Sequence, residues 1–208
     1  MHGMNYIQTL IDASYAIHRD MRGHTGGVIS IGKGTVIHNC SKQKLNTKNS
    51  TKSEVVGVSD FLPYTIWASY LLKAQGYKLK RNILFQDNTS AIKMIKNGKD
   101  SCDSKSRYIH IRYLFTKDVL NREEMDVQHC PTEQMIANFY TKPLQGKQHY
   151  NLRNIIIGHD NVPVEECVET SDNMATGKYT IGKVSKKNSR TSTKYGYKVS
   201  NNFKVQRR

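Results

Sequence analysis

Short β-branched runs fill the first 40 residues of this chain, and a long stretch of helical periodicity follows them. Residues 6–14 (YIQTLIDAS), 26–32 (GGVISIG) and 35–40 (TVIHNC) have the composition of strands. A Gly-Lys-Gly sequence at 32–34 separates the second run from the third, which is typical of a hairpin. From about residue 53 to 75, apolar residues recur at helical spacing. We therefore expect three strands followed by a long helix.

Helices and strands then alternate in the next part of the chain. We expect that Pro63 kinks or splits the long helix and that Trp67 lies in the core. The further elements are expected to be a buried strand at 82–86, a helix at 88–97 ended by Gly98, a helix at 109–120, a strand at 125–130 and a short helix at 133–140. This order fits an α/β fold with one mixed five-stranded sheet flanked by helices.

The charge of the chain is strongly positive. Lys and Arg number 32 against 17 acidic residues, which gives a formal net charge of +15. Such an excess favours a polyanionic partner, most simply nucleic acid, because phosphate neutralisation releases counterions. The same charge could also serve solubility alone.

The cysteines and the N-terminal segment indicate an intracellular protein. The four cysteines, Cys40, Cys102, Cys130 and Cys167, show neither CxxC spacing nor zinc-finger spacing with histidines. Reduced thiols are the expected state. The N-terminus lacks a signal-peptide pattern, and no apolar run approaches the roughly 20 residues of a membrane helix. We expect a cytoplasmic or nuclear location and no membrane partner.

Residues 159–208 have the composition of a basic low-complexity tail. The stretch from Asn173 to Arg208 contains ten Lys or Arg residues and no acid, and it is rich in Ser, Thr, Asn and Gly. Because it has few large apolar groups to bury, we expect it to be disordered. Such a tail would add non-specific affinity for nucleic acid.

Three acidic residues stand where strands end and helices begin. Asp12 lies near the end of the first strand, Glu54 near the start of the long helix and Asp87 directly after the fourth strand. Such positions can converge at one edge of a sheet. Carboxylates gathered there can bind two divalent cations about 3.5–4 Å apart, which activate a water and stabilise the leaving oxygen in phosphodiester cleavage. Mg²⁺ prefers hard oxygen ligands of this kind.

Each acid also has a purely structural explanation. Thr51 and Glu54 have the spacing of a helix capping box. Asp87 could cap the helix that follows it, and Asp12 could be a turn residue at a strand end. The spacing alone leaves both explanations open.

Six sequence blocks resemble, in order, the successive blocks of the ribonuclease H domains of copia-type retrotransposons. They read LIDASYA, HTGGVISIGKG, SKQKLNTKNSTKSEVVG, LFQDNTSAIKM, SRYIHIRYLFTKD and HCPTEQMIANFYTKPLQG. The likeness runs from about Tyr6 to Gly158 and places a ribonuclease H-like domain at 6–158, ahead of the tail at 159–208. The resemblance implies the ribonuclease H-like fold, dependence on two Mg²⁺ or Mn²⁺ ions, and endonucleolytic hydrolysis of RNA paired to DNA.

The resemblance also assigns four metal-binding and catalytic positions. The first three fall on Asp12, Glu54 and Asp87. The fourth falls on Asn138 in ANFYTKPL, where the family usually has an aspartate after the alanine. An amide oxygen can touch a metal but brings no negative charge. We therefore expect weaker binding of the second ion and slower hydrolysis.

Polar residues beside these positions are candidate contacts to the backbone of an RNA–DNA hybrid, although a solvated loop or helix capping would explain them equally well. They are Gln43, Lys44, Asn46, Lys48, Asn88 and Ser90. The resemblance further implies that the chain is a C-terminal fragment of a Pol polyprotein, with the reverse transcriptase domain of that polyprotein as a partner.

Two other functions stay open. Asn138 would suit a non-catalytic, nucleic-acid-binding relic of a decayed element, whereas the three intact acids favour catalysis. Asp87 and Glu123 are separated by 35 residues, a spacing known in transposases and integrases of the same superfold. We expect Glu123 in a turn between a helix and a strand, which argues against that third function.

Overall fold

A computed structural model describes residues 6–98, 107–122, 125–160 and 162 of the chain. Within these ranges, five strands form one mixed sheet in the order β3-β2-β1-β4-β5. The strands are β1 (Tyr6–Ser14), β2 (His24–Ser30), β3 (Ile37–Lys42), β4 (Arg81–Gln86) and β5 (Asp126–His129). The helices are α1 (Ser50–Ala74), α2 (Thr89–Asn97), α3 (Arg107–Asn121), the 3₁₀ turn η2 (Thr132–Gln134), α4 (Asn138–Thr141) and α5 (Gly146–Ile156).

The register of the central strands brings two strand ends to one edge of the sheet. β1 runs antiparallel to β2 and parallel to β4, with Leu10 paired to Phe85. Asp12 and Asp87 each follow that pair by two residues, so they lie level at the carboxyl edge. The mixed five-stranded sheet expected from the sequence is therefore confirmed.

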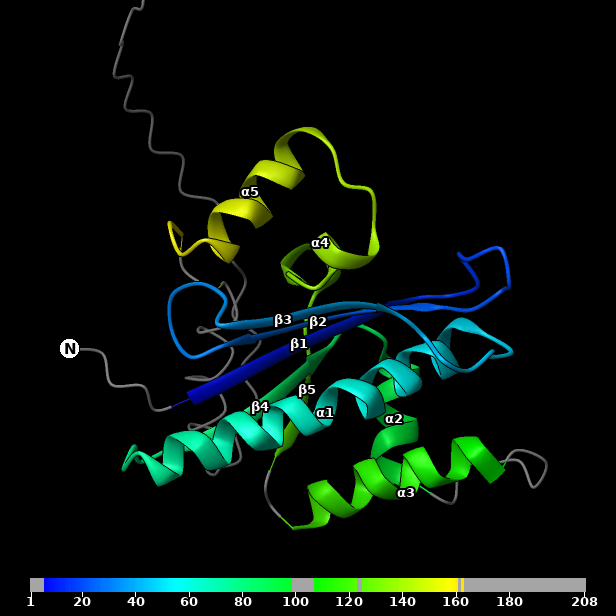
Figure 1. Ribbon diagram of the computed structural model, residues 1–208, viewed down its shortest axis with the longest axis horizontal. Coiled ribbons are helices and arrows are strands. Elements are labelled where there is room, and N and C mark those ends of the chain that lie inside the picture. The colour runs from blue at the N-terminus through cyan, green and yellow to red at the C-terminus, as the bar shows by residue number, and fades with distance from the viewer. Residues whose placement is uncertain (1–5, 99–106, 123–124, 161, 163–208) are drawn as a thin grey trace, which may run out of the picture.

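Helices cover both faces of the sheet, so the sheet separates two apolar clusters (Figure 1). One apolar cluster joins α1, α2 and α3 to the sheet through side chains such as Ile11, Phe61 and Ile95. The other lies on the side of α4 and α5 and includes Leu10, Phe85 and Met135. Neighbouring residues of β1 face opposite clusters because strand side chains alternate between faces.

Two adjacent glycines in β2 allow close packing on both faces. A Cβ atom at Gly27 would overlap the ring of Phe61 in α1, and one at Gly26 would crowd Tyr140 and Thr141 of α4. Because the two residues point to opposite faces, their lack of side chains lets a helix approach β2 from each side. This approach brings α1 and α4 toward the same end of β1.

The structure corrects several sequence expectations about helices. α1 continues through Pro63 without a break. Pro63 lies on the exposed side, where water can satisfy the carbonyl that loses its partner. The single helix expected at 133–140 is instead η2 followed by α4, and α5 was not expected.

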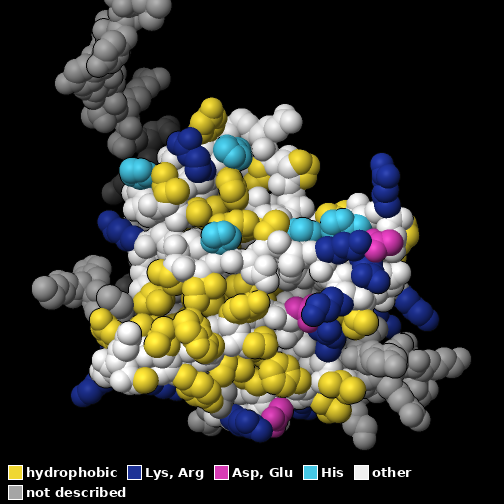
Figure 2. Space-filling view, in the orientation of Figure 1, with side chains coloured by type: hydrophobic (Ala, Val, Ile, Leu, Met, Phe, Trp, Pro, Cys, Tyr) yellow, Lys and Arg dark blue, Asp and Glu magenta, His cyan; other side chains and the backbone are white. Residues whose placement is uncertain are grey.

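The outer face of α1 is apolar. Trp67, expected in the core, is 58% exposed, and Tyr64, Tyr70 and Leu71 are exposed as well. In Figure 2, hydrophobic side chains cover much of the lower part of the view, where α1 and α3 lie. By length and composition, α1 could even cross a membrane, but 56% of its most apolar window is buried, and core helices of soluble proteins pass the same test. The expectation of no stretch of membrane length thus does not hold for α1.

Candidate metal centre

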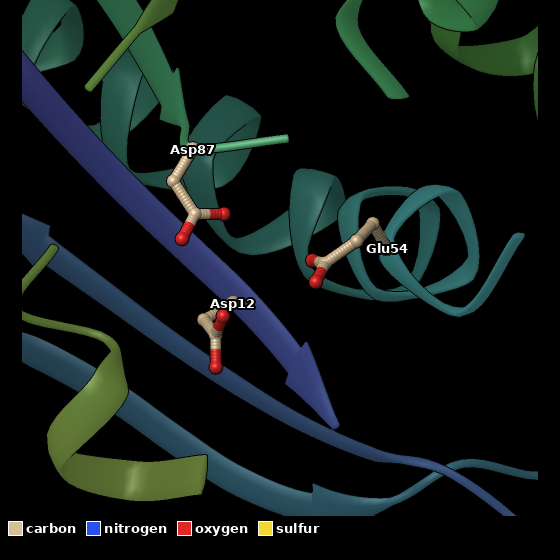
Figure 3. A group of neighbouring side chains, drawn as sticks. All are labelled: Asp12, Glu54 and Asp87. Atoms are coloured by element: carbon tan, nitrogen blue, oxygen red, sulfur yellow. The ribbon is translucent and has the colours of Figure 1, made fainter. Parts of the chain in front are cut away.

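Three carboxylates meet at the carboxyl edge of the sheet. Asp12 comes from β1, Glu54 from the start of α1 and Asp87 from the residue after β4 (Figure 3). One oxygen of each lies within 4.8 Å of the others. Asp12 is only 2% exposed and Glu54 5% exposed, while Asp87 is half-buried. The convergence expected from the strand and helix ends is what the structure shows.

The start of α1 is fixed against the sheet by small residues and one buried amide. Gly57 packs against Ala13 and Thr25 so closely that a Cβ atom there would lie 3.3 Å from each. The Gln43 side chain donates to Thr25 Oγ1 at 3.0 Å and to the Ser53 carbonyl at 2.9 Å. These contacts hold the first turn of α1 beside the end of β1, and so they place Glu54 beside Asp12.

Burial and mutual repulsion make this group of acids electrostatically unfavourable without a cation. Burial, followed by the charges of Asp12 and Asp87, raises the pKa of Glu54 to about 9. Burial also raises the pKa of Asp12, although hydrogen bonding from Thr141 and the charge of Lys142 oppose the rise. A cation bound among the three carboxylates would offset both effects, because it favours their ionised forms.

Gln86 holds two of the acids in place. Its Oε1 accepts from the backbone N–H groups of Asp87, at 2.8 Å, and Asn88, at 3.2 Å. Its Nε2 donates to Glu54 Oε2 at 3.2 Å. Because Gln86 is fully buried, it fixes Glu54 relative to the end of β4. In the sequence this residue is visible only as the end of a strand.

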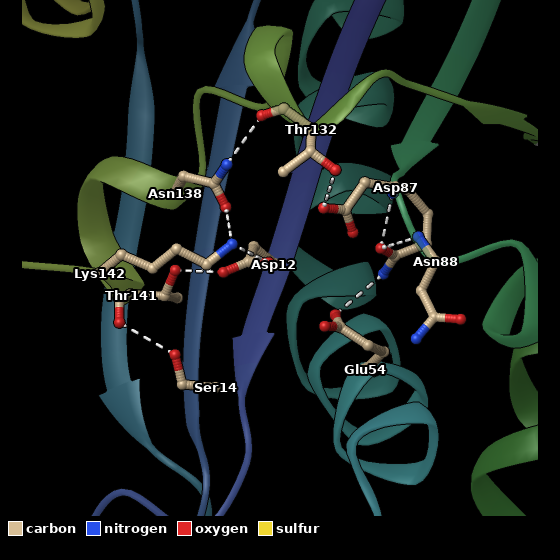
Figure 4. Close-up of polar contacts among 10 residues, drawn as sticks. Asp12, Ser14, Glu54, Asp87, Asn88, Thr132, Asn138, Thr141 and Lys142 are labelled. Carbon is tan, nitrogen blue, oxygen red and sulfur yellow. Dashed lines mark hydrogen bonds and ion pairs between the residues drawn. The ribbon is translucent and has the colours of Figure 1, made fainter. Parts of the chain in front are cut away.

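Hydroxyl groups from the segment after β5 orient the two aspartates (Figure 4). Thr132 Oγ1 donates to Asp87 Oδ2 at 3.1 Å. Thr141 Oγ1 donates to Asp12 Oδ2, and the Thr141 carbonyl accepts from Ser14 Oγ at 2.9 Å. Both threonines belong to the block HCPTEQMIANFYTKPLQG, but no pattern there distinguishes them from neighbouring polar residues.

Asn138 lies beside the acids and reaches them through a lysine. It opens α4, is 1% exposed, and donates from Nδ2 to the Thr132 carbonyl at 2.9 Å. Its Oδ1 accepts from Lys142 Nζ at 2.5 Å, and the same ammonium lies 3.5 Å from Asp12 Oδ1. Lys142 is another residue of the site that sequence reasoning missed, although it stands in the ANFYTKPL segment.

The structural explanations for the acids are wrong. Asn49, not Thr51, caps α1 by accepting from the Lys52 N–H at 2.9 Å. Asn88, not Asp87, caps α2 by accepting from the Ser90 and Ala91 N–H groups. Asp12 lies inside β1, paired with Gly26 of β2, and is not a turn residue. None of the three carboxylates therefore serves as a cap or a turn in this fold.

The candidate nucleic-acid contacts differ in their placement. Gln43 is buried and its amide is used inside the fold, so the expectation that it contacts a ligand is corrected. Lys44, Asn46 and Lys48 are exposed in the connection between β3 and α1. The remaining two are the half-buried cap Asn88 and the exposed Ser90. Glu123 and nearly all of the tail at 159–208 lie outside the described residues.

Comparison with known proteins gives no matching family model but several related polyproteins. The chain is 27% identical over 154 residues to the Retrovirus-related Pol polyprotein from transposon RE1 of Arabidopsis thaliana, covering 73% of the chain and 10% of that protein. It is 22% identical over 151 residues to the corresponding polyprotein from transposon TNT 1-94 of Nicotiana tabacum, covering 72% and 11%. The chain thus spans about a tenth of the length of these relatives.

Solved ribonuclease H structures also align with the chain. LC11-RNase H1, isolated from compost, has 10% identity and a TM-score of 0.43, covering 62% of this chain and 87% of its own. An N-terminal RNase H domain from Mycobacterium tuberculosis has 9% identity and a TM-score of 0.45, covering 67% and 95%.

The sheet order, the flanking helices and the acids at the edge agree with the ribonuclease H-like architecture that the sequence blocks led us to expect. By sequence, the chain is similar over about 150 residues to retrotransposon Pol polyproteins of plants, in agreement with the resemblance of the sequence blocks.

Proposed function

We propose that this chain is a metal-dependent endonuclease that hydrolyses the RNA strand of RNA–DNA hybrids during retrotransposon reverse transcription. The observation that carries the proposal is the group of three carboxylates with oxygens within 4.8 Å of one another. Burial and mutual repulsion raise the pKa of Glu54 in this group. Three convergent carboxylates with nothing but oxygen donors suit Mg²⁺ or Mn²⁺.

The residues of the chain have separate tasks in this proposal. Asp12, Glu54 and Asp87 would hold the cation, and Gln86 and Thr132 would keep Glu54 and Asp87 in position. A bound divalent cation would supply charge stabilisation and an activated water for phosphodiester hydrolysis. Burial raises the pKa of Glu54. Because a metal binds the ionised carboxylate, binding of the cation would release any proton that Glu54 holds.

Exposed cations lie on segments that lead to the same edge of the sheet. Arg19 in the β1–β2 connection and Lys44 and Lys48 in the β3–α1 connection are exposed. Cations there would neutralise phosphates of a hybrid whose scissile group reaches the carboxylates. The reverse transcriptase domain of the parent polyprotein is the proposed partner, and an intracellular site of action, cytoplasmic or nuclear, follows from this role.

Cleavage of a labelled RNA–DNA hybrid by the purified chain in Mg²⁺ or Mn²⁺ tests the proposal. The parent chain should cut the RNA strand of the hybrid slowly, because Asn138 adds no negative charge to the centre, and it should leave a DNA duplex intact. Asp87→Asn should abolish cleavage, whereas Asp126→Asn, the same change at an exposed residue of β5, should not. Cleavage by Asp87→Asn as fast as that by an active parent would overturn the metal centre as the active site.

A second candidate function is binding of nucleic acid without cleavage. Asn138 favours it, because the amide and the ammonium of Lys142 replace negative charge beside Asp12. Fluorescence anisotropy with a labelled hybrid separates the two functions. Tight binding without cleavage in either metal would favour the non-catalytic relic.

A further inference from the structure

The side chain of Lys142 stands between Asp12 and Asn138, on the α4 side of the acids. Its Nζ lies 2.5 Å from Asn138 Oδ1 and 3.5 Å from Asp12 Oδ1 (Figure 4). We propose that this ammonium takes the place of a second divalent cation, so that the centre binds one ion, held by Asp12, Glu54 and Asp87. This inference rests on the proposed function and narrows it.

The amide of Asn138 is fitted to its neighbours in one orientation. Its Nδ2 donates to the Thr132 carbonyl at 2.9 Å, which turns Oδ1 toward Lys142. The reverse orientation would set an N–H₂ group against the ammonium and an oxygen against the carbonyl. An aspartate at this position would likewise turn an oxygen toward the Thr132 carbonyl. The pocket therefore suits an amide that holds a lysine.

Helix geometry places the lysine at this position. Lys142 follows Asn138 by four residues, and its backbone N–H donates to the Asn138 carbonyl at 3.0 Å. Side chains four residues apart lie on the same face of a helix. The contact between Asn138 and Lys142 is thus made across the single turn of α4, and Lys142, the extended residue that caps this turn, places its ammonium near Asp12.

Charge balance favours one divalent cation. Three ionised carboxylates, one ammonium and one divalent cation sum to zero. A second divalent cation would leave an excess of positive charge beside Lys142, because Asn138 adds no negative charge. Neighbouring like charges repel strongly in a partly buried site. Lys142 is 41% exposed at its side chain, so its displacement by an ion is the competing outcome.

Manganese binding to the full chain tests the inference by counting ions. Isothermal titration and the electron paramagnetic resonance signal of free Mn²⁺ both give the number of ions bound per chain. The variants are Asn138→Asp combined with Lys142→Met, which restores a carboxylate and removes the ammonium, and Lys147→Met as a matched control on an exposed lysine of α5. Asp12→Asn measures binding outside the centre, and that binding is subtracted. Circular dichroism checks that each variant is folded.

The expected result is one ion in the parent and in Lys147→Met, and two ions in the double variant. Two ions in the parent would overturn the inference and leave the proposed function intact, because Lys142 would then be displaced. One ion in the double variant would also overturn it, because Lys142 and Asn138 would not be what excludes the second ion. No ion in the parent would instead contradict the metal-dependent function itself.

Discussion

At the scale of one residue, Glu54 shows that the ionised form of a buried carboxyl in this site is unfavourable without a cation. Its carboxyl is 5% exposed and shares a pocket with Asp12 and Asp87, and burial is the largest cause of its raised pKa, about 9. Such a residue contributes nothing favourable to folding when it is ionised alone. A ligand accounts for an acid at this position, because a buried apolar residue would pack there at lower cost.

The raised pKa of Glu54 predicts a pH dependence of stability. The folded chain binds the Glu54 proton more tightly than the unfolded chain, whose pKa is near 4.5. Between these two pKa values, the free energy of unfolding should fall as the pH rises, by at most about 1.4 kcal/mol per pH unit. Urea denaturation in EDTA at pH 6, 7 and 8 measures the slope. Glu54→Gln replaces the titratable carboxyl with a neutral amide and should flatten this slope. An unchanged slope would show that other groups are responsible.

Gln86 gives a second prediction at this scale. Gln86→Ala would leave the Asp87 and Asn88 N–H groups and the Glu54 carboxyl without this partner. We expect a decrease of about 1–3 kcal/mol in the free energy of unfolding, the cost of unsatisfied buried groups. Gln128→Ala is the matched control, since the Gln128 amide donates to the exposed Asp126 of the same strand, and it should change stability by less than about 0.5 kcal/mol. Equal decreases in urea denaturation would contradict this role.

At the scale of the element, the strands could be predicted better than the helices. The bounds expected for the first strand, 6–14, match β1, because most of its residues are β-branched or apolar. The helix expected at 133–140 is interrupted because Met135 has extended backbone geometry, with φ −72° and ψ 93°. α5 has a single buried residue, Leu152, and so it carries little apolar periodicity.

Some residues of the candidate site could be predicted from the sequence and others could not. Asp12, Glu54 and Asp87 could be predicted because strand and helix ends are visible in the sequence. Lys142 and Gln86 could not, because their roles depend on contacts between segments far apart in the chain. The expectation for Trp67 was wrong because apolar residues surround most of α1, and the pattern does not tell which side faces the sheet.

The contact between α1 and β2 predicts a coupled pair of substitutions. Gly27→Ala should destabilise the fold by about 1–3 kcal/mol, because the added methyl meets the Phe61 ring. Phe61→Ala in the same chain removes the ring atoms that the methyl would meet, so the double variant should lose less stability than the sum of the two single variants. A double-mutant cycle in urea measures the coupling between the two residues. Additive effects, with no coupling, would show that α1 shifts away without cost.

At the scale of the whole molecule, the charge is unevenly distributed, because residues 173–208 carry +10 of the formal net charge of +15. The three candidate metal ligands lie within the proposed domain at 6–158, whereas ten Lys or Arg residues and no acid lie from Asn173 to Arg208. We propose that the domain carries cleavage and that the basic tail carries non-specific affinity. Such a division would let each part be changed without the other.

Removal of the residues after 172 tests this division. The truncated chain should bind an RNA–DNA hybrid more weakly and with a flatter dependence on salt, by up to about 0.9 in the log–log slope for each phosphate that the tail no longer neutralises. A chain of full length with the ten Lys and Arg residues of the tail changed to Gln should behave like the truncated one, because charge and not length sets the slope. Anisotropy titrations between low and high salt measure the slope, and cleavage at saturating hybrid should stay near that of the parent. An unchanged salt dependence after truncation would show that the tail makes no contact with nucleic acid.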